Sequence, residues 1–332
     1  MPTSYSWNLP RRFARKMTDA WPPLPLDAWR DTYATLHMWT QIVGKTRLAL
    51  APPVNHWWHV AQYVTSKGLT TSSIPHGHRT FEVEFDFVDH RLTVTVSDGS
   101  TQSMPLRPQT VAEFYQEYLG LLGSVGIPVR IWPMPVEVES SLRFPDDGIH
   151  RSYDAEWANR MWRVLVQADR VLKSFRGRFL GKASPVHFFW GSFDLAATRF
   201  SGRSAPPHPG GAPNLGNWVM QEAYSHECSS IGFWPGGAAI PEAVFYAYAY
   251  PEPEGFRDYP IAPAAARYDE TMREFVLPYE SVRTSAAPDD TLLTFAQTTY
   301  AAAADLARWD RANLERRGSS GDRGHPTADA NQ

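Results

Sequence analysis

The clearest pattern in the chain is an alternation of apolar and polar residues between positions 81 and 97. Apolar residues occupy every second position from 81 to 87, and a second alternating run covers residues 92–96. A period of two predicts strands with one buried face, and two such runs joined by a short turn predict an antiparallel hairpin. We expect the intervening acidic residues Glu82, Glu84 and Asp86 to form its solvated face.

Other stretches have the period of a helix, because their apolar residues recur at steps of three and four. They cover residues 29–43, 111–122, 157–175 and the alanine-rich segment 292–311. The remaining apolar segments favour strands. We predict two short strands in residues 48–65, broken by Pro52 and Pro53, and others in 129–138, 184–200 and 243–253. A second hairpin is predicted through 273–282.

The order of these elements restarts in the second half of the chain. When the sequence is laid over itself with Pro53 on Pro185, six residues coincide without a gap: Pro53, Val54, Trp58, Ser72, Pro75 and His76 meet Pro185, Val186, Trp190, Ser204, Pro207 and His208. Identities that follow the order of the elements predict a duplication.

The predicted fold is therefore α+β, with two diverged copies of a helix–antiparallel strands–helix unit. The copies would cover 21–142 and 153–315, joined by a linker at 143–152 and related by a pseudo-twofold axis within one compact body. An arm at 1–20 and a disordered tail at 316–332 complete the prediction. A ligand site is expected in the crevice between the halves.

Composition narrows the class of protein. The net charge of -3 over 332 residues gives no basic field for nucleic acid. There is no run of about 18 apolar residues, so no membrane span is predicted. A single cysteine cannot form an intrachain disulfide. Because the N-terminus also has no signal-peptide core, a cytoplasmic location is expected.

Several long motifs resemble one known family. They are LHMWTQIVGKTRLALAPPVNHWWHV, FDFVDHRL, RIWPMPVE, SPVHFFWGSFDLAATRFSGR, PPHPGG, EAYSHE and GFWPGG. Together they are similar to the bacterial family called domain of unknown function 5996, over about residues 21–316. The resemblance implies a coherent protein, and it supplies no activity and no catalytic residues.

The first candidate for chemistry is the run NWVMQEAYSHECSS, which we expect to be helical. Glu222 and His226 would then lie one turn apart on one face, where a carboxylate and an imidazole can share a proton or a metal ion. His187, in an apolar strand, is the natural third ligand of a zinc or iron site. The alternative is an ordinary surface pair.

Further candidates could contact a substrate. Asp194 and Arg199 would either pair with each other or bind an anionic group. Tryptophans and histidines in the motifs above would line the pocket or belong to ordered loops over it. The substrate-binding candidates are His59, Trp58, Trp190, Asp194, Arg199, His208 and Trp234.

Three functions remain open. The first is a metal-dependent enzyme acting on a small molecule, anionic groups included, at the His/Glu site. The second is a non-catalytic protein that binds a small ligand in a tryptophan-lined pocket, since the chain has 13 tryptophans. The third is a scaffold protein with no ligand. The ionisable residues embedded in apolar strands favour the enzyme slightly, because burying them without use costs stability.

Overall fold

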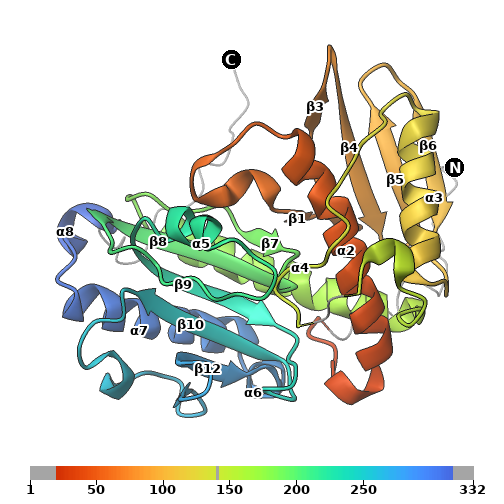
Figure 1. Ribbon diagram of the computed structural model, residues 1–332. Helices are drawn as coiled ribbons and strands as arrows, with labels where there is room; N and C mark the ends of the chain where they lie inside the picture. The colour runs from red at the N-terminus through yellow and green to blue at the C-terminus, as the bar shows by residue number, and fades with distance from the viewer. Residues whose placement is uncertain (1–19, 140–141, 317–332) are drawn as a thin grey trace, which may run out of the picture.

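The computed structural model describes residues 20–139 and 142–316 and contains two antiparallel sheets (Figure 1). The first sheet has the order β1 (Tyr63–Val64), β2 (Gly68–Thr70), β4 (Arg79–Asp86), β5 (Arg91–Val96) and β6 (Thr101–Pro105), and β3 (Ile74–His76) also pairs with β4. The second sheet has the order β11 (Arg267–Asp269), β12 (Glu274–Pro278), β10 (Val244–Tyr250), β9 (His226–Trp234), β8 (Asp194–Ser204) and β7 (His187–Phe189).

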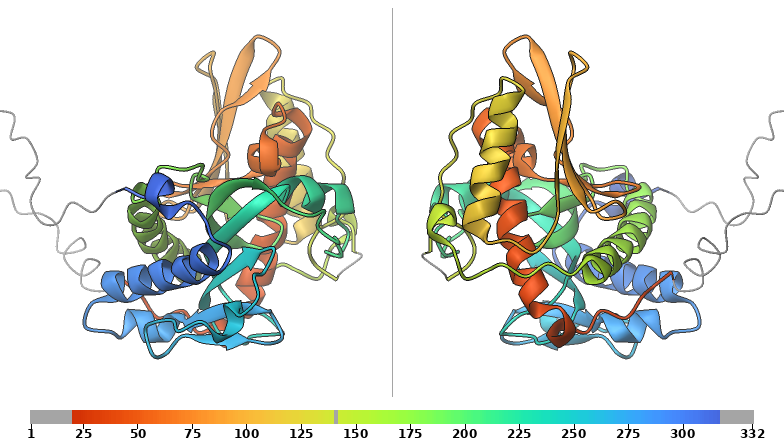
Figure 2. Two further views of the ribbon diagram at one scale, coloured as in Figure 1. Left: turned by 90° about the vertical axis from the view of Figure 1, so that its left-hand side faces the viewer. Right: turned by 90° about the vertical axis from the view of Figure 1, so that its right-hand side faces the viewer.

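Four long helices cover these sheets. They are α2 (Arg30–Leu50), α3 (Val111–Ser124), α4 (Ala155–Gly177) and α7 (Pro288–Leu306). Figure 2 shows α4 and α7 on one face of the second sheet and the short α5 (Asn217–Ala223) on the other. The remaining short elements are η1 (Leu26–Ala28), η2 (Asn55–Val60), η3 (Phe144–Asp146), η4 (Phe256–Asp258), α6 (Tyr279–Arg283) and α8 (Arg311–Leu314).

Helix α2 joins the two halves of the molecule. Every residue from Leu36 to Arg47 is buried, as expected for a helix that has protein on all sides. Toward α3, the Trp39 ring stacks on Phe114 with centroids 4.5 Å apart. On another side, His37 Nε2 lies 2.8 Å from the Gly191 carbonyl oxygen of the second half. One continuous apolar core therefore includes residues from both sheets.

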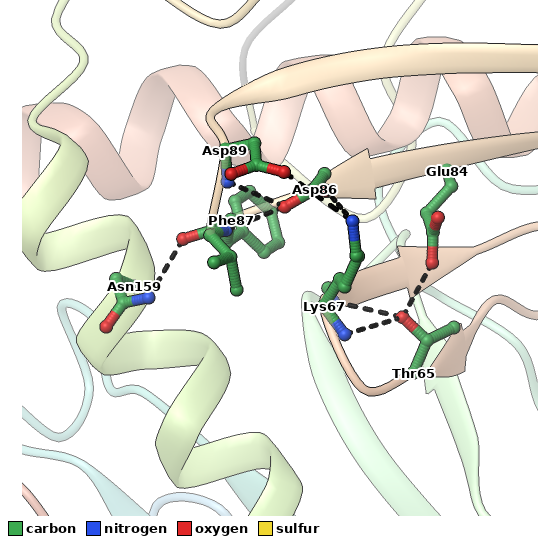
Figure 3. Close-up of polar contacts among 9 residues, drawn as sticks. Thr65, Lys67, Glu84, Asp86, Phe87, Asp89 and Asn159 are labelled. Atoms are coloured by element: carbon green, nitrogen blue, oxygen red, sulfur yellow. Dashed lines mark hydrogen bonds and ion pairs between the residues drawn. The ribbon is translucent and has the colours of Figure 1, made fainter. Parts of the chain in front are cut away.

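A polar cluster fixes the hairpin of the first sheet against α4 (Figure 3). Asp86 is buried and accepts hydrogen bonds of 2.8 Å from the backbone amides of Val88 and Asp89. Lys67 Nζ lies 3.1 Å from the Asp86 carboxylate, and Asn159 on α4 donates a 2.9 Å bond to the Phe87 carbonyl. The side chain of Asp86 is thus a structural cap, and not part of a solvated face as predicted.

The structure confirms most of the predicted elements. The four helices and the 81–97 hairpin form where the periodicity places them, β7, β10 and β12 lie within predicted strand segments, and β8 starts in one and continues to Ser204. The predicted hairpin through 273–282 is wrong, because β12 is followed directly by helix α6. Three predicted strands are wrong in whole or in part. Residues 48–50 continue α2, which Pro52 and Pro53 then end, and NHWWHV forms the turn η2 with left-handed backbone at His56 and Trp57 (φ 60° and 61°). Residues 129–138 form no strand.

The α+β class is confirmed, whereas the duplication and its pseudo-twofold axis stay a prediction. The segments that coincide in sequence differ in structure, because 55–60 is a turn and 187–189 is strand β7. The strand orders of the two sheets also differ. The predicted arm and tail fall almost entirely outside the described residues. None of the described helices has the length and apolar character that a membrane crossing requires.

Candidate functional site

Alternation along the second sheet creates a polar face opposite the helices. In β8, Asp194, Ala196 and Thr198 border a cavity of about 340 Å³, whereas Leu195 and Ala197 belong to the core. Strand β10 repeats this pattern in the sequence VFYAYAY. Tyr246 and Tyr248 face the cavity, and the small alanines between them leave room for α7 to approach the other face.

Elements from two distant parts of the chain cover this cavity, which we call the carboxyl cavity. Val219, Met220 and Ala223 of α5 line it together with His56, Trp57 and Trp58 of η2. The two elements are tied together by His56 Nδ1, which lies 2.9 Å from the Ala223 carbonyl oxygen. The Trp57 ring also packs on the Trp218 ring, with centroids 5.1 Å apart.

Asp194 lies at the start of β8 and is fully hydrogen-bonded by protein hydroxyls. Tyr246 donates to one carboxylate oxygen and Ser192 to the other. Gly232, on the strand between them, makes this possible, since a Cβ atom there would overlap the Tyr246 ring. Burial raises the pKa of Asp194 above its ordinary value, although these hydrogen bonds oppose the shift.

Glu137 reaches the carboxyl cavity from the irregular segment 129–138. Its left-handed backbone (φ 59°) is strained for a residue with a side chain. Gln41 of α2 holds the preceding residue by two bonds of 2.9 Å, to the Val136 carbonyl and from the Val136 amide. The carboxyl group lies against Gly191, where no Cβ atom would fit. Burial, with the nearby Asp194 charge, raises the pKa of Glu137 to about 7.

Glu274 supplies a third carboxyl group from β12. Its Oε2 atom is buried and has no hydrogen-bond partner among the described residues. Burial raises the pKa of Glu274 to about 8, and the charges of Asp194 and Asp269 add to this effect. Glu274 lines the cavity, and its buried oxygen atom keeps an unused capacity to accept a hydrogen bond.

Apart from the His56 imidazole, the tryptophan indoles and the Cys228 thiol, the rest of the polar lining consists of hydroxyl groups. Tyr224 and Tyr248 share a hydrogen bond of 2.7 Å, and Thr198 and Ser230 share one of 3.0 Å. Within the described part of the chain, neither lysine nor arginine lines the carboxyl cavity. The cavity therefore presents three carboxyl groups, hydroxyl groups and aromatic rings to its contents.

Three of the predicted substrate-binding residues, Trp58, Asp194 and Trp234, line the carboxyl cavity. Trp190 instead borders a smaller cavity of about 170 Å³, which also has Glu137 in its wall. His208 lies behind the wall, stacked on Tyr224 with ring centroids 4.7 Å apart.

The predicted metal site is not assembled. Helix α5 ends at Ala223 and His226 begins strand β9, so Glu222 and His226 are not one helical turn apart. The alternation in HECSSIGFW continues the sheet and overrides the helical spacing. No three His, Cys, Asp or Glu side chains in 20–139 and 142–316 are grouped as a metal ion requires.

His187, the third predicted ligand, is a core residue in β7. It is buried among Trp58, Tyr63 and Phe189, with ring centroids 5.3–5.6 Å away. Neither ring nitrogen has a hydrogen-bond partner among the described residues, and burial lowers the pKa of His187 to about 3. The imidazole is therefore neutral at physiological pH.

His59 and Arg199 also lie outside the cavity. His59 is buried, and its Nδ1 atom accepts a 3.2 Å bond from the Val54 amide. Arg199 comes five residues after Asp194 in β8, and side chains alternate between the two faces of a strand. Its side chain therefore lies on the face of the sheet that the helices cover, away from Asp194. Its guanidinium stacks 3.5 Å from the Phe175 ring centroid and donates to the Phe175 carbonyl. The predicted pairing of Asp194 with Arg199 is wrong.

Sequence reasoning missed Glu137, Glu274 and the tyrosines. The tyrosines had a signal, because the alternation in VFYAYAY places three of them on one face. Glu274 had the same signal, since Glu274 and Val276 alternate with the core residues Phe275 and Leu277. Glu137 had none, because its position depends on an irregular backbone.

Comparisons with known proteins give one result. A model described as a family of unknown function, DUF5996, matches residues 21–316. Neither the curated proteins nor the solved structures contain a match to the chain. The family match covers both sheets and all residues of the carboxyl cavity. This chain belongs to the DUF5996 family of unknown function.

Proposed function

We propose that the carboxyl cavity binds a small molecule that carries a positively charged nitrogen group, such as an amine or a guanidine. One observation supports this most strongly: Glu137, Asp194 and Glu274 line a single cavity, and no lysine or arginine among the described residues lines it. A cationic ligand would supply the missing opposite charge. It would also fit the lining of tryptophan and tyrosine rings, whose faces attract cations.

The size and wall of the cavity agree with a small ligand. Its volume of about 340 Å³ lies within the range of small-molecule sites, at the lower end. The unpartnered Glu274 Oε2 atom would accept a hydrogen bond from the ligand. Because burial raises the carboxyl pKa values, a cation that binds would favour the ionised carboxylates and release protons.

An enzyme that uses the same residues is a second candidate. Ser192 interacts with both Glu137 and Asp194, so it connects two carboxyl groups that could exchange a proton. The pKa of Glu137, at about 7, suits a group that takes up and returns a proton at neutral pH. If the protein is such an enzyme, it would convert the bound amine to a product, with Glu137 as the general acid or base.

A paired ligand screen tests the proposal. Primary amines and guanidines would be compared with hydroxyl compounds of the same shape, for example phenethylamine with 2-phenylethanol, by the shift in melting temperature. We expect the cationic members to stabilise the protein and the neutral members not to do so. Asp194→Asn combined with Glu274→Gln should abolish the shift. Equal stabilisation by both classes, or a shift that survives in the double variant, would refute the proposal.

A further inference from the structure

A second site lies beside the carboxyl cavity and involves a different charge. Lys45 is on the central helix α2, and its residue is only 1% exposed. The Nζ atom is buried and has no hydrogen-bond partner among the described residues. No carboxylate in the described part of the chain forms an ion pair with it within 4 Å. A buried ammonium group without a counter-charge is costly.

Aromatic rings surround this ammonium group. Lys45 Nζ lies 4.9 Å from the Trp132 ring centroid, 5.6 Å from that of Trp190 and 6.0 Å from that of Phe144. The adjoining space is the cavity of about 170 Å³, whose wall contains Lys45 and the indoles of Trp57, Trp132, Trp190 and Trp218. We call it the lysine cavity.

Two glycines make this arrangement possible. Gly44 precedes Lys45, and a Cβ atom there would overlap the Trp190 indole. A Cβ atom at Gly216 would likewise overlap the Trp218 indole. Trp132 and Trp218 are large apolar residues, yet they are 57% and 63% exposed. Two exposed indoles at the rim of a cavity are an unusual surface for a protein that has nothing to bind there.

The charge of Glu137 acts on Lys45, but the two groups form no ion pair within 4 Å. Its carboxyl group is turned onto Gly191 and toward Ser192, on the Asp194 side. Burial lowers the pKa of Lys45 to about 8, and Glu137 only opposes this shift. At neutral pH the ammonium form therefore remains, without an ion-pair partner among the described residues.

We propose that the lysine cavity binds a small aromatic carboxylate. The carboxylate would pair with the Lys45 ammonium group, and the ring would lie among the four indoles. An anion completes the missing charge pair, and a planar ring suits walls made of tryptophan. This inference is independent of the cation proposed for the carboxyl cavity, because different residues would hold the charged group.

Benzoate, benzyl alcohol and benzylamine are suitable probes, since they differ mainly in charge. Binding to the full chain would be measured by quenching of tryptophan fluorescence and by calorimetry. We expect benzoate to bind at least tenfold more tightly than benzyl alcohol, and benzylamine not to bind in this cavity. Lys45→Met should remove the preference for benzoate, whereas Lys173→Met, at an exposed lysine paired with Asp169, should leave it unchanged.

Two more variants keep the test decisive. Trp218 is 63% exposed and packs on Trp57 at the rim, so Trp218→Ala should fold and weaken benzoate binding several-fold. Asp194→Asn should leave benzoate binding intact, which separates this site from the carboxyl cavity. Equal affinity for benzoate and benzyl alcohol, or benzoate binding that persists in a folded Lys45→Met protein, would overturn the proposal. So would a Trp218→Ala protein that binds benzoate as well as the unaltered chain does.

Discussion

At the residue scale, the carboxyl cavity is built from acidic groups whose environment opposes their ionisation. Asp194 accepts hydrogen bonds from two hydroxyl groups, whereas one oxygen atom of Glu274 has no partner in the described part of the chain. Buried acceptors without partners are uncommon in folded proteins. The protein therefore retains groups that reduce its stability when the cavity is empty. This is expected of residues that serve to bind a ligand and not to stabilise the core.

The pH dependence of stability follows from Glu274. The folded protein holds this proton more tightly than the unfolded chain does, with a pKa of about 8 against an ordinary 4.5. Ionisation of Glu274 therefore costs stability as the pH rises from about 4.5 to about 8. Glu274→Gln should stabilise the protein at pH 8, by on the order of 1–3 kcal/mol, and have little effect at pH 4.

Urea unfolding at the two pH values measures this difference. The control is Glu270→Gln, because that carboxylate is exposed and pairs with Arg257 on the surface. If Glu274→Gln changes the free energy of unfolding by the same amount at pH 8 and at pH 4, ionisation of Glu274 does not destabilise the folded protein.

At the scale of elements, the sequence predicts those parts whose pattern is local. The helices and the hairpin at 81–97 follow from their periodicity, and the tyrosine face of β10 could have been predicted from VFYAYAY in the same way. The turn η2 could not, because its left-handed residues His56 and Trp57 are stabilised by contacts with α5, far along the chain.

Because only local patterns can be predicted from the sequence, only part of the candidate site was predicted. Trp58 and Asp194 were found because an aromatic and an acidic residue stood out within predicted apolar strands, and Trp234 because it belongs to a loop rich in glycine and proline. The pairing of Glu222 with His226 failed because a seven-residue helix gives way to a strand within one turn. Glu137 depends on Gln41 and Pro213, which hold its neighbouring backbone from two distant segments. No local pattern encodes such contacts.

The hairpin of the first sheet depends on Asp86. Burial alone would raise the pKa of Asp86, but the hydrogen bonds from the Asp89 and Val88 amides and from Lys67 outweigh it and hold the pKa below its ordinary value. The carboxylate thus stabilises the fold above the ordinary carboxyl pKa, and this contribution is lost as the pH falls through the lower folded value. Asp86→Ala should cost about 1–3 kcal/mol at pH 7.

Glu82→Ala is the matched control, since Glu82 is an exposed acidic residue on the same strand. Its effect should stay within about 0.5 kcal/mol. Chemical denaturation of both variants at pH 7 and pH 3 would measure the difference. An Asp86→Ala protein as stable as Glu82→Ala at pH 7 would contradict the role assigned to the cap.

At the scale of the whole molecule, the two sheets cooperate through α2. The carboxyl cavity takes its floor from the second sheet and part of its cover from η2, which follows α2 in the first half. Glu137 comes from the connection between the halves and lines both the carboxyl cavity and the lysine cavity. Neither half alone supplies a complete site.

We therefore expect the chain to unfold in one cooperative transition despite its two sheets. Helix α2 is buried from both sides, so the loss of either sheet would expose it. Scanning calorimetry should give a single peak whose calorimetric and van't Hoff enthalpies agree. Two separated peaks, or a fragment ending at residue 139 that folds cooperatively, would show that the halves are independent.

We propose above all that the three carboxyl groups of the carboxyl cavity bind a cationic ligand. The most direct measurement is a crystal structure of the full chain grown with the amine that stabilises it most. We predict that the ligand nitrogen lies within hydrogen-bond distance of Glu137, Asp194 or Glu274, with its apolar part against Trp58 or Trp234. An amine bound elsewhere, with the carboxyl cavity holding only water, would contradict the claim.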